Sequence, residues 1–268
     1  MLRPGIYVAN DAVYLSDPSS QKPKELHKLV SRLIESDYGQ IPLSLIDVGC
    51  ASGAFILHAR SVLNIARCVG LDISTMHLRQ AQALLPWAEF INEPIESLDK
   101  SKGRMFDICT CLGTMSIFDD TIAILANLLS LVKAGGSLYV ADLVNDFPVD
   151  VIMRYRRSER GAEWKAGFNV RSQLTYEEAA RKIDPRIELR WTDFEMPFAI
   201  SQTPDPLRVW TIQTEHKPHQ QVVGTGQLIN FKILSARKLP RSSARLETTR
   251  QCESIAGKCP FGTSPQVL

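Results

Sequence analysis

Short apolar runs alternate with longer segments of helical period between residues 43 and 143. The apolar runs are near-continuous, which is typical of parallel strands covered on both faces. They are Leu43 to Val48, Cys68 to Leu71, Glu89 to Asn92, Phe106 to Leu112 and Ser137 to Leu143. The segments Gly53 to Ile65 and Asp119 to Val132 place apolar residues three and four positions apart, as amphipathic helices do. This succession predicts a doubly wound, Rossmann-like α/β sheet, mostly parallel.

The flanking segments depart from this rhythm. Lys22 to Glu35 predicts a helix packed on the sheet, and Thr175 to Ile183 predicts a last helix. Ile187 to Met196 and Gly226 to Leu239 predict two further strands, the C-terminal one antiparallel. The chain therefore divides into a leader (1–42), a core (43–143), an Arg- and aromatic-rich insertion (144–173), a C-terminal part (174–239) with a long excursion at 197–226, and a tail (240–268) expected to be disordered.

Composition and charge narrow the class of protein. The chain has 268 residues, of which 44% are hydrophobic and 22% are charged, so disorder throughout is excluded. A formal charge of +2 argues against general nucleic-acid binding. The longest apolar stretch, Thr121 to Val132, is shorter than the roughly 20 residues of a spanning helix. With no secretory signal pattern at the N-terminus, we expect a cytoplasmic protein. Six scattered cysteines are expected to be structural.

The first strand leads into a turn of small residues. The segment LIDVGCASGAF, from Leu45, is an apolar strand followed by small residues at alternate positions before a helix. Such a turn lets a ligand approach the backbone at the carboxyl edge of the sheet. The second strand ends in GLDIS, which places Asp72 at the same edge. An acid there can accept hydrogen bonds from a ribose diol.

Together these motifs resemble the class I S-adenosylmethionine-dependent methyltransferases. The first family motif is matched by Asp47, Gly49, Ala51 and Gly53. It is followed in order by Asp72, by FDICTCLGTMSIFDD from Phe106 and by LVKAGGSLYVADL from Leu131. Four ordered motifs thus cover residues 43–143. A nicotinamide-dependent Rossmann enzyme, the alternative, would have a glycine one residue after Gly53.

The resemblance implies S-adenosyl-L-methionine as the cofactor and assigns its contacts. Its methionyl part would be held by Asp47 and the backbone of Gly49, Cys50, Ala51 and Gly53, its ribose by Asp72, an adenine face by Ile73 and its ammonium by the carbonyl near Leu112. Ala51 replaces the commonest middle glycine, which a methyl side chain tolerates where φ is negative. Pro94 stands where an acid often meets the adenine amino group, so this role passes to Glu93 or Glu96 or is absent; either glutamate equally fits a solvated loop.

Methyl transfer from a sulfonium is an in-line displacement, so a general base is optional. Ile117 lies where many small-molecule relatives have a histidine. Asp119 and Asp120 precede a helix, where capping is favoured over catalysis. No residue is therefore assigned a catalytic role, and no metal is expected.

The insertion is the expected acceptor site. The segment from Arg154 to Arg171 contains six basic residues and two acidic ones. A helix begun at Asp146 would place Arg154 and Arg157 on one face, suited to a carboxylate or phosphate, with Trp164 available to stack. A solvated helix face explains the same pattern.

We therefore expect a methyltransferase for a small, anionic metabolite, such as a sugar, a sugar nucleotide or a polar biosynthetic intermediate, with the insertion and the excursion as lids. An RNA or protein methyltransferase and a catalytically silent cofactor-binding subunit are the alternatives. The expected partner is a small molecule, with neither a membrane nor nucleic acid. The acceptor atom and the oligomeric state stay open.

Overall fold

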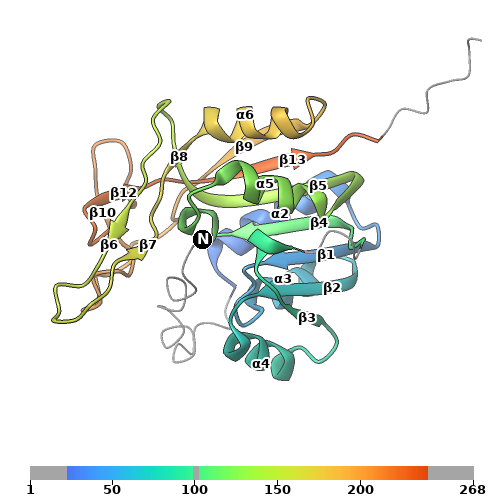
Figure 1. The fold of residues 1–268 in the computed structure, drawn as a ribbon, viewed down its shortest axis with the longest axis horizontal. Coiled ribbons are helices and arrows are strands. Elements are labelled where there is room, and N and C mark those ends of the chain that lie inside the picture. The colour runs from blue at the N-terminus through green and yellow to red at the C-terminus, as the bar shows by residue number, and fades with distance from the viewer. Residues whose placement is uncertain (1–22, 99–102, 241–268) are drawn as a thin grey trace, which may run out of the picture.

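A mixed β-sheet forms the centre of the computed structural model, which describes residues 23–98 and 103–240 (Figure 1). Its main strands are β1 (Leu43–Val48), β2 (Ile65–Asp72), β3 (Glu89–Asn92), β4 (Phe106–Leu112), β5 (Val132–Asn145), β9 (Glu188–Phe194) and β13 (Phe231–Arg237). They lie in the order β3-β2-β1-β4-β5-β13-β9. The first five pair in parallel, and β13 is antiparallel to both β5 and β9. The predicted doubly wound sheet with an antiparallel C-terminal strand is confirmed.

Helices cover both faces of the sheet. They are α2 (Glu25–Tyr38), α3 (Ala54–Val62), α4 (Thr75–Leu84), α5 (Thr121–Ser130) and α6 (Gln173–Ile183), with the short 3-10 turns η3 (Ile95–Ser97) and η5 (Met115–Ile117). Leu45 packs in the cluster with α2 and α3, whereas its neighbour Ile46 packs in the cluster with α5 and α6. Because successive strand residues point to opposite faces, burial on both faces requires the continuous apolar runs seen in the sequence.

Side-chain oxygens cap the N-termini of three of these helices. The side chains of Ser74, Asp120 and Ser172 accept hydrogen bonds from backbone N–H groups in the first turns of α4, α5 and α6. Each bond satisfies one of the backbone donors that the start of a helix leaves unpaired. The capping role favoured for Asp120 is confirmed.

The prediction of a helix that begins at Asp146 is wrong. The chain instead forms a hairpin of β6 (Arg154–Tyr155) and β7 (Lys165–Ala166), followed by β8 (Arg171–Ser172), which pairs with the end of β5. Asn145 accepts a bond from the Phe147 N–H and donates one to the Val149 carbonyl, closing a local turn. Side-chain bonds of this kind compete with helix formation, and the β-branched residues that follow favour extended backbone.

The strand predicted from Gly226 to Leu239 is interrupted. It divides at Asn230 into β12 (Gln227–Ile229) and β13. β12 joins a three-stranded sheet with β10 (Trp210–Ile212) and β11 (Gln220–Val223). The Asn230 carbonyl accepts the Val144 N–H, and its side-chain oxygen accepts a bond from Gln220. Asn230 therefore forms hydrogen bonds with both sheets at the point where the chain passes from one to the other.

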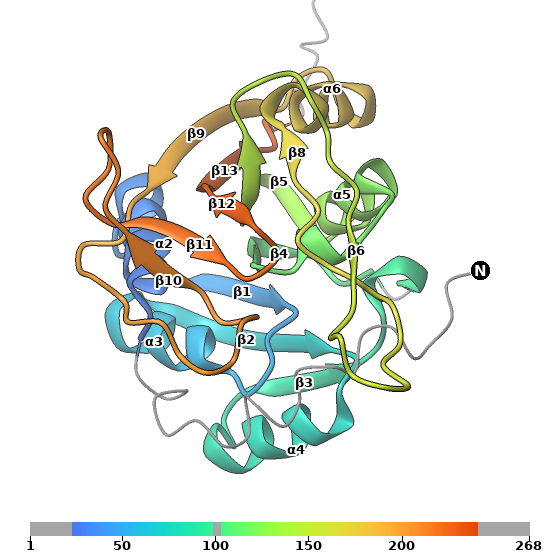
Figure 2. The ribbon, with the colours of Figure 1, turned by 90° about the vertical axis from the view of Figure 1, so that its left-hand side faces the viewer.

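The insertion and the three-stranded sheet gather at one end of the main sheet (Figure 2). Because β8 pairs with Val144 and Asn145, this is the carboxyl end of β5. No helix within the described ranges is long and apolar enough to cross a membrane. Cys50, Cys68, Cys109 and Cys111 are buried and free, as expected. The other two cysteines and the expected disordered tail, apart from Pro240, lie outside the described residues.

Histidine 27 makes the stability of this fold depend on pH. Its ring is 7% exposed on α2 and meets Phe55 of α3 edge to face, 5.5 Å between ring centroids. Its Nδ1 atom has no hydrogen-bond partner among the described residues. Burial, followed by the nearby charge of Lys24, lowers the pKa of His27 to about 3. Protonation is therefore disfavoured in the folded state.

We expect the free energy of unfolding of the parent, relative to His27→Leu, to fall by about 2 kcal/mol between pH 7 and pH 5. In this interval the unfolded chain binds a proton at His27 and the folded chain does not. Urea unfolding of both proteins at the two pH values measures the difference. The comparison isolates His27, because Asp47 and Asp142, whose pKa values burial raises, act in the opposite direction in both proteins. Parallel pH profiles would contradict the assignment.

Candidate functional site

The turn between β1 and α3 carries three residues in the left-handed region of backbone conformation. The φ angles are 76° at Gly49, 46° at Ala51 and 82° at Gly53. The sequence-based condition that φ be negative at Ala51 is not met. An alanine in this region places its Cβ close to the following carbonyl oxygen, at a cost of roughly 1–2 kcal/mol. The turn therefore stores strain at the second of its small residues.

Two glycines are required here by close packing as well. A Cβ atom on Gly49 would lie 2.4 Å from Oγ1 of Thr114, and one on Gly53 would lie 2.7 Å from Cδ1 of Leu85. A side chain at either position would force its neighbour to move. The turn thus lies directly against Thr114, in the loop that follows β4.

Asp72 lies at the end of β2 and holds the same turn. Its Oδ2 atom accepts the Ala51 N–H at 2.9 Å, and its Oδ1 atom accepts the Ser74 N–H at 2.8 Å. Each carboxylate oxygen has a second lone pair, so the group can still accept two hydroxyl donors. Ile73, the next residue, is 42% exposed. The structure therefore brings together the turn, the acid and the apolar side chain that the sequence had singled out.

Asp47 lies behind the turn, inside the sheet. It is 3% exposed, and its Oδ1 atom accepts a hydrogen bond from Oγ1 of Thr110 at 2.7 Å. Burial, opposed by the Thr110 bond and assisted by the charge of Asp72, raises the pKa of Asp47 to about 7. The carboxyl group therefore links β1 to β4 inside the sheet.

The remaining cofactor candidates lie on two further strand ends. Glu93 follows β3 and forms an ion pair with Arg104, 2.8 Å between Oε2 and Nη1, whereas Glu96 is exposed. Leu112 ends β4 and precedes Gly113, where φ is 77°. Within residues 23–98 and 103–240, no heavy atom beyond the neighbouring residues lies within 4 Å of a Cβ built on Gly113. The space beside Leu112 is therefore open.

A buried acid that sequence reasoning missed holds the loop after β4. Asp142, near the carboxyl end of β5, is 1% exposed and accepts hydrogen bonds from the N–H groups of Ser116 (2.9 Å) and Leu143 (2.7 Å). Burial raises the pKa of Asp142 to about 6. The detectable signal was an acid within the apolar run LYVADLV, since a charge in a doubly covered strand needs partners.

The three acceptor candidates, Arg154, Arg157 and Trp164, line one groove of about 670 Å3. The insertion supplies these residues together with Met153, Tyr155, Arg156, Ser158 and Glu159, and the C-terminal excursion supplies Pro206, Leu207, Gly224 and Thr225. Two segments far apart in the sequence therefore enclose a space large enough for a small ligand.

The two arginines do not share a helix face, contrary to the expectation. Arg154 pairs with Asp119, while Arg157 pairs with Asp205 of the excursion at 2.6 Å. The capping aspartate, Asp120, is not involved. The guanidinium of Arg156 lies over the ring of Trp164, 4.9 Å from its centroid, and has no carboxylate partner among the described residues. Three cations thus line the groove, two of them already paired.

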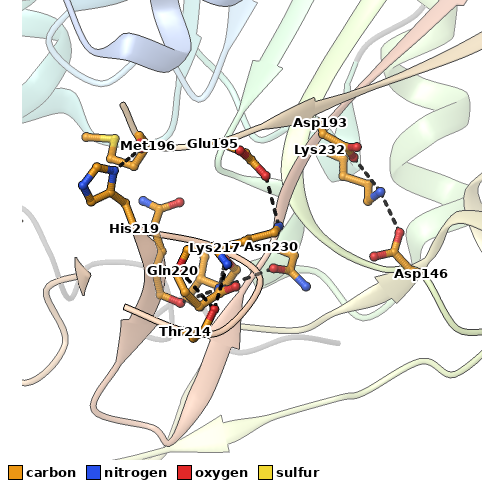
Figure 3. A network of polar contacts seen from close by, with 12 residues as sticks. Asp146, Asp193, Glu195, Met196, Thr214, Lys217, His219, Gln220, Asn230 and Lys232 are labelled. Carbon is orange, nitrogen blue, oxygen red and sulfur yellow. Dashed lines mark hydrogen bonds and ion pairs between the residues drawn. The ribbon is translucent and has the colours of Figure 1, made fainter. Parts of the chain in front are cut away.

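Lys232 fixes the base of the insertion (Figure 3). Its ammonium group lies 2.6 Å from a carboxylate oxygen of Asp146 and 2.6 Å from one of Asp193, and its side chain is 12% exposed. Asp146 begins the insertion, whereas Asp193 belongs to β9. The lysine on β13 therefore ties the start of the insertion to the edge of the main sheet.

Residues 45–136 match the protein family described as "Methyltransferase domain". The chain is 28% identical over 134 residues to a ubiquinone biosynthesis O-methyltransferase of Nitrosomonas europaea, covering 47% of this chain and 56% of the relative. It is 27% identical over 153 residues to a trans-aconitate 2-methyltransferase of Enterobacter sp., covering 57% of this chain and 58% of the relative. The match thus spans little more than half of each of these curated relatives.

A solved structure described as a DhpI–SAH complex has a similar fold. The TM-score is 0.55 and the identity 15%, over 87% of this chain and 93% of that one. At this identity the likeness establishes the fold.

The strain at Ala51 leads to a stability prediction. We expect Ala51→Gly to raise the free energy of unfolding by up to about 1 kcal/mol, because relief of the left-handed strain outweighs the added flexibility of glycine. Ala54→Gly, in the first turn of α3, is the matched control and should lower it by up to about 1 kcal/mol. Thermal unfolding distinguishes the two, and equal destabilisation would show that Ala51 is not strained.

Proposed function

We propose, from the premise that this chain carries a class I S-adenosylmethionine-dependent methyltransferase domain, that it transfers a methyl group to a small, anionic metabolite bound in the groove. The observation that carries the proposal is Asp72. Its carboxylate holds the glycine-rich turn and keeps lone pairs at the carboxyl edge of the sheet, where open α/β folds bind ligands.

The residues present fit S-adenosylmethionine. Asp72 would accept hydrogen bonds from the ribose hydroxyls, and the exposed side chain of Ile73 would contact the adenine. The backbone of the turn and the carbonyl near Leu112 would hold the methionyl part, because the glycine beside Leu112 leaves room there. Glu93 remains a candidate for the adenine amino group, although its carboxylate is paired with Arg104.

When bound, the cofactor supplies an electrophilic methyl group on a sulfonium. The protein then needs to align a nucleophile with that group and exclude water. Among the candidate acids, Asp120 caps α5 and Asp119 pairs with Arg154, so neither is proposed as a general base. These residues therefore contribute to catalysis by positioning the acceptor.

An anionic acceptor is favoured by the cations of the groove. Arg156 has no carboxylate partner among the described residues, and a substrate carboxylate or phosphate can replace Asp205 beside Arg157. Trp164 is 58% exposed and can cover an apolar or planar part of the acceptor. The relative named trans-aconitate 2-methyltransferase, whose named substrate is an anion, is consistent with this class.

The cofactor site is tested with Asp72→Asn. We expect the affinity for S-adenosylmethionine to fall by about 1.5–3 kcal/mol, the scale of a hydrogen bond to a charged group. The asparagine keeps an oxygen for one of the two backbone donors. Glu89→Gln, which removes an exposed ion pair with Arg67 on the same sheet, is the control and should leave the affinity unchanged. Titration calorimetry measures both, and unaltered binding by folded Asp72→Asn would refute the site.

The acceptor class is tested by screening carboxylates, phosphates and their neutral analogues for release of S-adenosylhomocysteine. We expect turnover of anionic acceptors, and an acceptor KM about tenfold higher in Arg157→Gln, with kcat little changed. Arg160→Gln, in the same insertion but outside the groove lining, should behave like the parent. Turnover restricted to neutral acceptors, or an Arg157→Gln variant with the parent's KM, would refute anion recognition in the groove.

A further inference from the structure

The segment from Phe168 to Arg171 contacts four separate parts of the molecule. The Phe168 carbonyl accepts a bond from Gln227 of β12, and Val170 exchanges two backbone bonds with Val151. The Asn169 N–H donates to the Ser116 carbonyl. Arg171, 6% exposed, donates to Thr121 Oγ1 and to the Asp119 carbonyl. This segment therefore joins the insertion to the three-stranded sheet and to the loop after β4.

Asn169 makes the central contact with its side chain. It is 1% exposed, and its Oδ1 atom accepts the Met153 N–H at 2.7 Å. Its Nδ2 atom donates to the Phe118 carbonyl at 3.0 Å and to Oδ1 of Asp119 at 3.3 Å. One buried amide thus uses its acceptor on one chain segment and both donors on another.

These two segments belong to the two halves of the proposed site. Met153 lines the groove and precedes Arg154, whereas Phe118 and Asp119 lie in the loop that begins after Leu112. The Asp119 carboxylate is shared, because it accepts from Asn169 and pairs with Arg154. Asn169 therefore lies between the acceptor groove and the loop expected to meet the methionyl group.

The backbone next to Asn169 is strained. Phe168 has a φ of 56°, in the left-handed region that bulky side chains rarely adopt, and its ring packs edge to face on Tyr155. Such conformations persist only where surrounding contacts determine them, and they are frequent at functional sites. The strain is consistent with a segment whose position is set by function.

We propose that Asn169 is a positioning residue that couples the groove to the cofactor edge. By binding the Met153 N–H, the Phe118 carbonyl and the Asp119 carboxylate at once, it fixes the loop after Leu112 in the conformation that receives the methionyl group. An acceptor that orders Arg154 then favours cofactor binding, and the cofactor favours the acceptor to the same degree. The identity of the two ligands in this inference rests on the proposed function. The connection between the groove and the loop rests on the contacts of the Asn169 amide alone.

Asn169→Asp tests the link, because it keeps an acceptor for Met153 and removes both donors to the loop. We expect S-adenosylhomocysteine to bind about five- to tenfold more weakly, as for one or two lost hydrogen bonds. Hydrogen exchange of the Ser116 and Phe118 amides should become faster. Asp150→Asn is the matched control: Asp150 lies in the same insertion, and its side-chain bonds to described residues go to Ser172 and Thr175, so neither readout should change.

Swapping the amide of Asn169 with the carboxylate of Asp119 provides a rescue experiment. In Asn169→Asp/Asp119→Asn the amide and the carboxylate change places, so a donor again faces an acceptor, and part of the lost affinity should return. If Asn169→Asp does not fold, Asp119→Ala removes the shared carboxylate from the loop side, and weaker S-adenosylhomocysteine binding is again expected.

Two results would overturn the proposal. One is a folded Asn169→Asp, or Asp119→Ala in its place, with the parent's affinity and the parent's exchange in the loop. The other is an equal loss in Asp150→Asn, which would indicate a purely structural role. If the parent itself does not bind S-adenosylhomocysteine, the proposed function fails, and the exchange comparison still decides whether Asn169 positions the loop.

Discussion

Carboxylates at the end of an apolar sheet hold the backbone of the turns that form the site. Asp72 accepts the N–H groups of Ala51 and Ser74, and Asp142 accepts those of Ser116 and Leu143. A buried N–H left without a partner costs about 1–3 kcal/mol, so these bonds restrict where each turn can lie. Since parallel strands end at one edge, the turns so held are brought together there.

The groove is shaped by contacts of two kinds. Exposed ion pairs, such as Arg157 with Asp205, contribute at most about 1 kcal/mol each to stability, so the arginine can exchange its carboxylate partner for another anion. Buried polar side chains, Asn169 and Arg171 above all, have no water as a substitute and therefore hold their segments in place. This division suits a binding site: fixed walls carry arginines whose partners a ligand can replace.

Backbone strain lies on both sides of the proposed site. Ala51 is in the turn between β1 and α3, and Phe168 is in the segment that joins the insertion to the loop after β4. Both residues occupy conformations that glycine would adopt more easily. In each case a hydrogen bond of the strained residue fixes the geometry: the Ala51 N–H donates to Asp72, and the Phe168 carbonyl accepts from Gln227.

The sequence alone determined the α/β core, because burial on both faces of a parallel sheet imposes continuous apolar runs, and it located the turn and Asp72, because a strand end followed by small residues is a local pattern. It did not determine the insertion: a helix expected near Asp146 is a hairpin, since Asn145 closes a turn with its own neighbours. Nor did it pair Arg154 with Asp119, or join Asn169 to Met153 and Phe118. Those contacts link residues 16 to 51 positions apart, and only the folded chain decides which distant polar groups satisfy one another.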